Sequence, residues 1–180
     1  MSILLPGIIL ALTIALIYQS TTIRKQKAKL NRTEKWHEIA ITDALTKIPN
    51  RFAFENKVKE LDKPVFLILF DIDKFKQIND LHGHLEGDRV LKSCAKLLSE
   101  VFFEKEYEIF RIGGDEFAVI SEGISEHKII DKLFAIRKKE ESGLGFSISK
   151  GYAFITSKKD FQRAFKHADE MLYADKANTD

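Results

Sequence analysis

The order of the hydrophobic segments constrains the fold of this sequence more than any other feature. The patterns predict, in order, a buried strand at 65–70, an amphipathic helix at 88–102, two strands at 107–112 and 116–121, a charged helix at 126–140 and a strand at 145–156. This β-α-β-β-α-β order is typical of an α+β domain of the split-βαβ, ferredoxin-like type. Extra helices are expected near 50–61 and after the last strand.

The predicted topology brings two acidic positions together. A right-handed crossover makes the first two strands parallel, so both end at the same edge of the sheet, and the third strand lies antiparallel between them. Asp71, at the end of the first strand, is therefore expected beside the turn that contains Gly113, Gly114, Asp115 and Glu116.

The residue types of that turn favour a reaction on a phosphate-bearing ligand. Glycine supplies the positive φ values of a tight hairpin and lets a ligand approach the backbone. Two close carboxylates repel each other unless a cation or a proton intervenes, and Mg²⁺ prefers such oxygen ligands. An acid after a strand also commonly serves an ordinary turn, so the residues alone leave both interpretations open.

Five segments, in order, resemble the GGDEF domain of bacterial diguanylate cyclases. They are DALTKIPNR (43–51), FDIDKFKQINDLHGHLEGD (70–88), RIGGDEF (111–117), SKGYA (149–153) and HADEMLYADK (167–176). The resemblance implies the nucleotidyl-cyclase palm form of the ferredoxin-like fold. It also implies an enzyme that condenses two GTP into cyclic di-GMP and releases two pyrophosphates, as a homodimer with one GTP in each subunit.

The same resemblance assigns the metal-binding and catalytic residues. Asp71 and Asp115, with the backbone carbonyl of Ile72, are expected to hold two Mg²⁺ ions per active site, with Mn²⁺ as a substitute. Asp115 and Glu116 are the implied catalytic residues, and Glu116 would assist deprotonation of the ribose 3′-hydroxyl. Two ions about 4 Å apart can activate one oxygen and stabilise the leaving oxygen.

Six positions match residues that bind the nucleotide in the family: Asn79, Asp88, Lys76, Gly113, Gly114 and Lys176. Asn79 and Asp88 match the positions that read the guanine edge, and the two lysines match phosphate contacts. A carboxylate accepts from N1–H and the 2-amino group of guanine, and adenine offers no such pair. This favours GTP over the substrates of another nucleotidyl cyclase or a polymerase-palm enzyme, and no nucleic-acid partner is expected.

Two departures from the family pattern are visible. Glu104 and Tyr107 stand where many members have an Arg-x-x-Asp inhibitory site, so no inhibitory site and no product feedback through it are expected. The sequence ends at Asp180, at the position of a phosphate-contacting arginine, which predicts weaker triphosphate binding. The alternative function is therefore a catalytically weak or inactive GGDEF module that binds GTP or another protein.

The N-terminal segment is predicted to anchor the chain in a membrane. Residues 3–18 carry no charge and could span a bilayer when flanking residues are added, whereas no cleavage site supports a signal peptide. The domains expected are a transmembrane anchor at 1–20, a basic helical stalk at 21–41 and a GGDEF domain at 42–180. Basic residues after the apolar run predict that the chain following it lies in the cytoplasm. Together with the family resemblance, this implies a single-pass protein of the bacterial inner membrane with its catalytic domain in the cytoplasm.

Other conspicuous residues have structural interpretations. The single cysteine, Cys94, excludes an internal disulfide and a multi-cysteine zinc site, and its helical neighbours predict a buried thiol. Asp73 is expected to brace its loop. Asp43, Arg51 and Arg111 are interpreted as scaffold or interface positions.

Overall fold

The computed structural model describes residues 16, 18–27, 29 and 40–177, and contacts divide the chain into two units, 1–40 and 41–180. The described residues of the first unit are helical. Within the described part of the chain, no helix is both long and apolar enough to cross a bilayer. The transmembrane segment predicted at 1–20 falls mainly outside the described residues, as does much of the stalk at 21–41, so both stay predictions.

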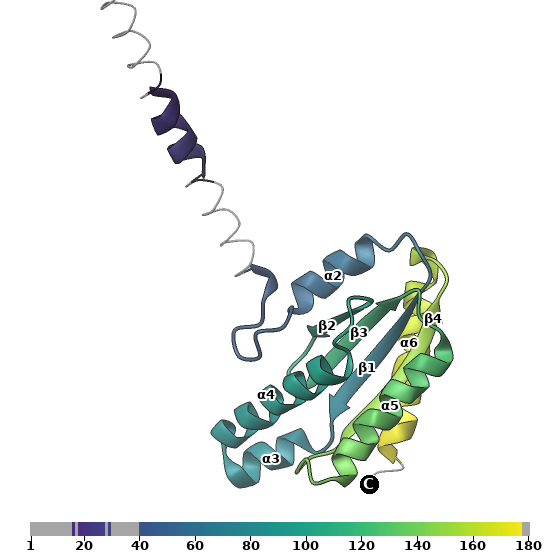
Figure 1. Ribbon diagram of the computed structural model, residues 1–180. Helices are drawn as coiled ribbons and strands as arrows, with labels where there is room; N and C mark the ends of the chain where they lie inside the picture. Colours follow the sequence, from purple (N-terminus) through teal and green to yellow (C-terminus); the bar gives the residue numbers. More distant parts are fainter. Residues whose placement is uncertain (1–15, 17, 28, 30–39, 178–180) are drawn as a thin grey trace, which may run out of the picture. The chain divides into compact units, whose positions relative to one another are not determined.

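The second unit contains six helical elements and four strands (Figure 1). In chain order they are α2 Arg51–Lys59, β1 Val65–Ile72, α3 Phe75–His82, α4 His84–Val101, β2 Tyr107–Arg111, β3 Glu116–Glu122, α5 Glu126–Glu141, β4 Ile148–Ile155, the 3-10 turn Lys158–Asp160 and α6 Phe161–Ala177.

The four strands form one sheet in the order β2-β3-β1-β4, and every neighbouring pair is antiparallel. Since β3 lies antiparallel between β1 and β2, these two strands are parallel to each other. The predicted β-α-β-β-α-β topology is therefore confirmed. The register places Asp71 of β1 directly opposite Glu116 of β3.

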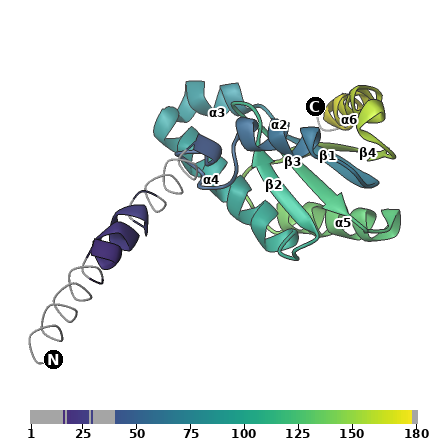
Figure 2. The ribbon, with the colours of Figure 1, turned by 90° about the horizontal axis from the view of Figure 1, so that it is seen from above.

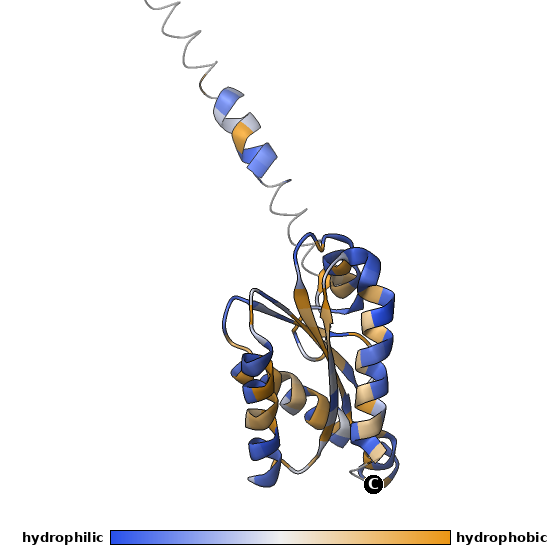
Figure 3. Ribbon diagram, turned by 90° about the vertical axis from the view of Figure 1, so that its right-hand side faces the viewer, coloured by the Kyte–Doolittle hydropathy of each residue, from blue (hydrophilic) through white to orange (hydrophobic). Residues whose placement is uncertain are grey.

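Helices cover both faces of the sheet. Alternate residues of β1 point to opposite faces, as the two-residue period of a strand requires. Phe66, Ile68 and Phe70 pack with buried residues of α4 and α5, whereas Val65, Leu67 and Leu69 pack with α2 and α6. Figure 2 shows α5 and α6 on opposite sides of the strands, and Figure 3 shows the sheet nearly edge-on between the helices.

Helix α6 lies very close to the edge strand β4. A Cβ atom at Gly151 of β4 would collide with the backbone carbonyl of Ala168 in α6, so only glycine permits this approach. Ala164 and Ala168 are the buried residues of the helix, and their small side chains keep its axis near the sheet. This packing fixes the last turn of α6, which carries Lys176, beside the end of β1.

Two helix boundaries differ from the sequence-based expectation. The helix expected at 88–102 begins four residues earlier, at His84, and α2 is shorter than the expected 50–61. Asn50 caps α2, because its side chain accepts a hydrogen bond from the backbone N–H of Ala53 at 3.1 Å. The buried position predicted for Cys94 is confirmed, and burial raises the pKa of its thiol.

Candidate active site

Three acids meet at the edge of the sheet where β1 ends and β3 begins. Asp71 faces Glu116 across the two strands, and the backbone N–H of Ile72 donates to the carbonyl of Asp115 at 3.2 Å. Asp71 belongs to the alternation of β1 that faces α2 and α6. The expected adjacency of Asp71 and the glycine-containing turn is therefore present in the fold.

The turn itself is built differently from the expectation. Neither Gly113 nor Gly114 is among the described residues with positive φ, so the proposed need for a left-handed backbone was wrong. Gly113 instead leaves room for the carboxylate of Glu116, which would have to move if a Cβ atom were present there. Around Gly114 the space is open, which leaves the backbone accessible to a ligand.

Arg111 holds the turn in place. Its guanidinium donates to the carbonyl of Gly114 at 2.7 and 3.3 Å and to the carboxylate of Asp43 at 3.0 Å. Asp43 also accepts from the backbone and the hydroxyl of Thr46 at 2.8 and 2.6 Å. Asp43 and Arg111 thus link the start of the domain to the acidic turn, which fits the scaffold alternative of their interpretation as scaffold or interface positions.

The Asp43 network predicts a pH-dependent contribution to stability. Burial raises the pKa of Asp43, but the hydrogen bonds from Thr46 and Arg111 outweigh it and hold the pKa below its ordinary value. A carboxyl whose folded pKa is lowered stabilises the protein above its unfolded pKa and loses that contribution as the pH falls through the folded pKa. We expect Asp43→Asn to cost about 2 kcal/mol at pH 7 and progressively less below about pH 4.

Chemical denaturation followed by circular dichroism, at several pH values, measures this difference. Asp62→Asn, which changes an exposed acid in the loop before β1, serves as the control and should cost little at any pH. A penalty for Asp43→Asn that is the same at pH 7 and at the acid limit would contradict the prediction.

The carboxylate of Asp71 is paired with Lys176. The ammonium of Lys176 lies 2.6 Å from Asp71 Oδ1. Burial raises the pKa of Asp71 above its ordinary value. The hydrogen bond from Lys176 lowers the pKa but offsets only part of that effect, and the negative charge of Asp115 raises it further. Lys176 was expected to contact phosphates, and its contact with an acid of the site was not anticipated.

Asp73 braces the end of β1, as expected. Its Oδ1 accepts from the hydroxyl of Ser149 in β4 at 2.6 Å, and its backbone N–H donates to the carbonyl of Ser147 at 3.0 Å. These bonds join the segment after β1 to the start of β4. They limit the movement of the backbone that carries Asp71 and Ile72.

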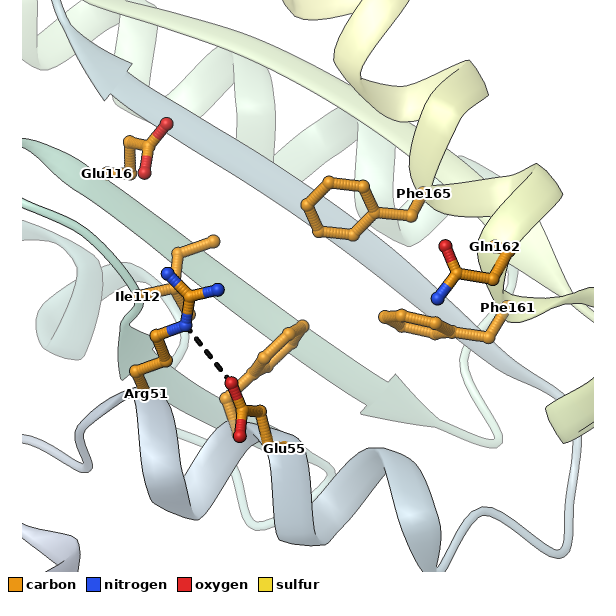
Figure 4. Close-up of a pocket in the computed structure, with 8 residues that line it drawn as sticks. Arg51, Glu55, Ile112, Glu116, Phe161, Gln162 and Phe165 are labelled. Atoms are coloured by element: carbon orange, nitrogen blue, oxygen red, sulfur yellow. Dashed lines mark hydrogen bonds and ion pairs between the residues drawn. The ribbon is translucent and has the colours of Figure 1, made fainter.

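Glu116 lies at one end of a cavity of about 360 Å³ (Figure 4). Phenylalanines of α2 and α6 line this cavity, as do Arg51 and Glu55, which are one turn apart on α2 and pair at 3.1 Å. Burial raises the pKa of Glu116, and the charges of Asp71 and Asp115 raise it further. A carboxylate with a raised pKa accepts a proton more readily near neutral pH.

The predicted nucleotide-reading residues lie on the helices that follow β1. Asn79 and Lys76 belong to α3, and Asp88 belongs to the first turns of α4. The amide of Asn79 packs against Gly87, which precedes Asp88. The side chains of Asn79 and Asp88 are partly buried, whereas Lys76 is exposed. Helix α3 follows β1 directly and begins near the edge of the sheet where β1 ends (Figure 1).

Comparison with known proteins identifies the domain. The sequence profile described as "Diguanylate cyclase, GGDEF domain" matches residues 40–180. The chain belongs to the diguanylate cyclase GGDEF-domain family.

Relatives of this GGDEF domain include cyclases and a membrane protein. It is 36% identical over 152 residues to Probable diguanylate cyclase DgcI of Escherichia coli (strain K12), a match that covers 84% of this chain and 34% of DgcI. It is 32% identical over 152 residues to an uncharacterized membrane protein of Staphylococcus aureus (strain USA300), covering 74% of this chain and 42% of that protein. The chain thus spans less than half of each relative.

A solved structure supports the fold. The coiled coil and GGDEF domain of DgcB from Caulobacter crescentus, in complex with c-di-GMP, matches with a TM-score of 0.75 at 27% identity. The match covers 88% of this chain and 94% of that one.

Three groups of this GGDEF domain would be the donors to a divalent cation: the carboxylates of Asp71 and Asp115 and the carbonyl of Ile72. Among residues 40–177 and the few described before them, no group of three or more His, Cys, Asp or Glu side chains is arranged to hold a metal ion. Mg²⁺ commonly takes one or two carboxylates and completes its shell with water and substrate phosphates. The donor set therefore fits a cation that binds together with a nucleotide.

At the position of the family's inhibitory site, Glu104 forms an ion pair with Lys132. Lys132 of α5 donates to both carboxylate oxygens of Glu104 at 2.7 and 2.8 Å and to the carbonyl of Val101 at 2.7 Å. Its ammonium also lies 5.0 Å from the ring centre of Phe103. The acid that replaces the arginine thus joins the segment before β2 to α5. Asp180 lies outside the described residues, and the effect predicted for it stays a prediction.

Sequence reasoning missed the partners of the acids. Lys176 pairs with Asp71, and both Arg51 and Asp169 influence the pKa of Glu116. Arg51 was interpreted as a scaffold or interface position, and Asp169 was not singled out. Its place in the family segment at 167–176, beside Lys176, was the available signal.

Proposed function

We propose that this GGDEF domain is a diguanylate cyclase that condenses two GTP into cyclic di-GMP and two pyrophosphates. The observation that carries the proposal is the meeting of Asp71, Asp115 and Glu116 at one sheet edge, with Lys176 beside them. Family membership and the relatives named as diguanylate cyclases support it.

The residues have distinct roles in this reaction. Asp71, Asp115 and the carbonyl of Ile72 would hold Mg²⁺ or Mn²⁺, which activates the attacking oxygen and stabilises charge on the leaving pyrophosphate. Glu116 accepts the proton of the ribose 3′-hydroxyl. The 3′-oxygen then bonds to the α-phosphorus of the other nucleotide as the bond to pyrophosphate breaks. Lys176 and Lys76 neutralise phosphate charge, and the open backbone at Gly114 leaves room for the nucleotide.

Ring closure requires two nucleotides, and each domain is proposed to hold one. The active species is therefore a homodimer in which the two sites face each other. A membrane anchor at residues 1–20, passing once through the inner membrane with the domain in the cytoplasm, would raise the effective concentration of the second copy. The relative from Staphylococcus aureus that is named as a membrane protein supports this location.

Recognition of guanine is proposed to depend on Asp88 and Asn79. A carboxylate accepts from both N1–H and the 2-amino group, and hydrogen bonds to charged groups contribute about 1.5–3 kcal/mol each. We expect Asp88→Ala to weaken GTP binding by a factor of ten or more and to leave weak ATP binding unchanged. Titration with fluorescent GTP and ATP analogues measures both constants, and an equal loss for the two nucleotides would contradict guanine reading.

The function is tested by product analysis. Full-length protein in nanodiscs is incubated with GTP and Mg²⁺, and the products are separated by chromatography. Cyclic di-GMP with two pyrophosphates for each ring is the expected result, and ATP should give no cyclic product. A folded protein that binds GTP without forming product would instead support the alternative of a non-catalytic GTP-binding module.

A further inference from the structure

Lys176 is paired with one of the two carboxylate oxygens of Asp71, the acid proposed as a metal ligand. Its ammonium is 2.6 Å from Asp71 Oδ1, and that oxygen is buried from solvent. The Asp71 side chain is only 14% exposed, whereas the lysine side chain is 37% exposed and can move outward. A cation can therefore reach Oδ1 only after the ammonium has left it.

The pairing also explains how the acids tolerate one another without a metal ion. Asp71 has Asp115 and Asp73 as charged neighbours, and like charges held close in a partly buried site repel one another. Lys176 is the cation that the described structure pairs with Asp71. It is held there by α6, whose close approach to β4 depends on Gly151.

We infer that Lys176 is an exchangeable counter-ion, which a divalent cation displaces from Asp71 and which then pairs with the phosphates of the bound nucleotide. The inference rests on the proposed function, because it takes Asp71 as a metal ligand and a nucleoside triphosphate as the ligand. Displacement without a nucleotide leaves the ammonium without its carboxylate and is unfavourable. Displacement with a nucleotide bound allows the Lys176 ammonium to pair with the phosphates in place of the carboxylate.

Metal ion and nucleotide are therefore coupled through one side chain. Because such coupling is reciprocal, the nucleotide tightens metal binding by the same factor as the metal tightens nucleotide binding. The two carboxylates alone form a weak cation site, in keeping with the lack of any larger acidic cluster among the described residues. The site would fill with metal mainly when the substrate is present.

Binding of Mn²⁺ to the full-length protein without nucleotide tests the inference. Electron paramagnetic resonance of free Mn²⁺ gives the dissociation constant for wild type, Lys176→Met and Lys176→Arg. Removal of the competing ammonium is expected to tighten Mn²⁺ binding about tenfold in Lys176→Met, within the usual range of coupling between sites. Lys176→Arg keeps the cation and should resemble wild type. Lys166→Met, an exposed lysine of the same helix, is the matched control.

A second titration measures the coupling itself. An α,β-methylene analogue of GTP, which cannot release pyrophosphate, should tighten Mn²⁺ binding strongly in wild type and by about a tenfold smaller factor in Lys176→Met. Equal or weaker Mn²⁺ binding by the folded Lys176→Met protein, with unchanged coupling, would overturn the inference.

A measurement on the wild-type protein tests displacement without relying on the correct folding of any variant. With the α,β-methylene GTP analogue already bound, the NMR signals of the Lys176 side-chain terminus should shift when Mg²⁺ is added, and signals that do not move at saturating Mg²⁺ would reject displacement. Product analysis separates the two proposals. If wild type forms cyclic di-GMP but the Lys176 variants bind Mn²⁺ as wild type does, the counter-ion role is rejected and the cyclase activity stands. If Lys176→Met binds Mn²⁺ more tightly but wild type forms no product, the cyclase activity is rejected and the counter-ion role stands.

Discussion

Replacement of Asp115 by asparagine is expected to lower the rate of cyclic di-GMP formation about a thousandfold, which corresponds to about 4 kcal/mol. An amide is a poorer ligand than a carboxylate for a hard divalent cation, and such a cation contributes several kcal/mol of charge stabilisation. The fold should survive, because loss of the Asp115 charge reduces the repulsion of Asp71 that raises the pKa of Asp71.

Initial rates of product formation and thermal melting, measured on the same preparations, check this prediction. Glu122→Gln is the matched control, since Glu122 is the last residue of β3, the strand that begins directly after Asp115, and it pairs with Lys63 at the opposite end of that strand. It should keep the wild-type rate. An Asp115→Asn protein that makes product at the wild-type rate would remove Asp115 from the mechanism.

Glu116→Gln is expected to lower turnover by about 10²–10⁴, the usual contribution of a general base. Glutamine has nearly the same shape but cannot accept the proton of the 3′-hydroxyl. The side chain lies over Gly113 and borders the cavity beside Arg51, so an isosteric replacement preserves the packing.

The ratio of effects on kcat and on nucleotide binding distinguishes chemistry from structure. Binding of the α,β-methylene GTP analogue and of Mn²⁺ should change little in Glu116→Gln, while kcat falls. If binding is lost in parallel with turnover, Glu116 positions the nucleotide or the metal and does not act as the base.

Topology was the most predictable part of this molecule. The continuous apolar run at 65–70 is short enough to indicate a buried strand, and the handedness of the crossover then fixes which strand ends coincide. Asp71 and the turn at 113–116 could therefore be placed side by side without coordinates. The start of α4 was less predictable, because residues 84–87 include a glycine and carry little helical pattern before Val90.

Contacts that depend on the packing of distant elements could not be read from the pattern. The pairing of Lys176 with Asp71 requires the approach of α6 to β4, which is decided by Gly151 and two alanines. The reason for Gly113 was also misjudged, since the carboxylate of Glu116 fills the space where a Cβ atom would lie. Lys132 could not be matched to Glu104 for the same reason, because 28 residues separate them in the sequence.

Anomalous diffraction from crystals that contain Mn²⁺ and the α,β-methylene GTP analogue locates the cation most directly. If Asp71 and Asp115 hold it, the strongest anomalous peak lies in contact with both carboxylates and the carbonyl of Ile72, with Lys176 turned from Asp71 to the phosphates. A peak elsewhere, with the ammonium still on Asp71, would contradict a shared metal site at the meeting of β1 and β3.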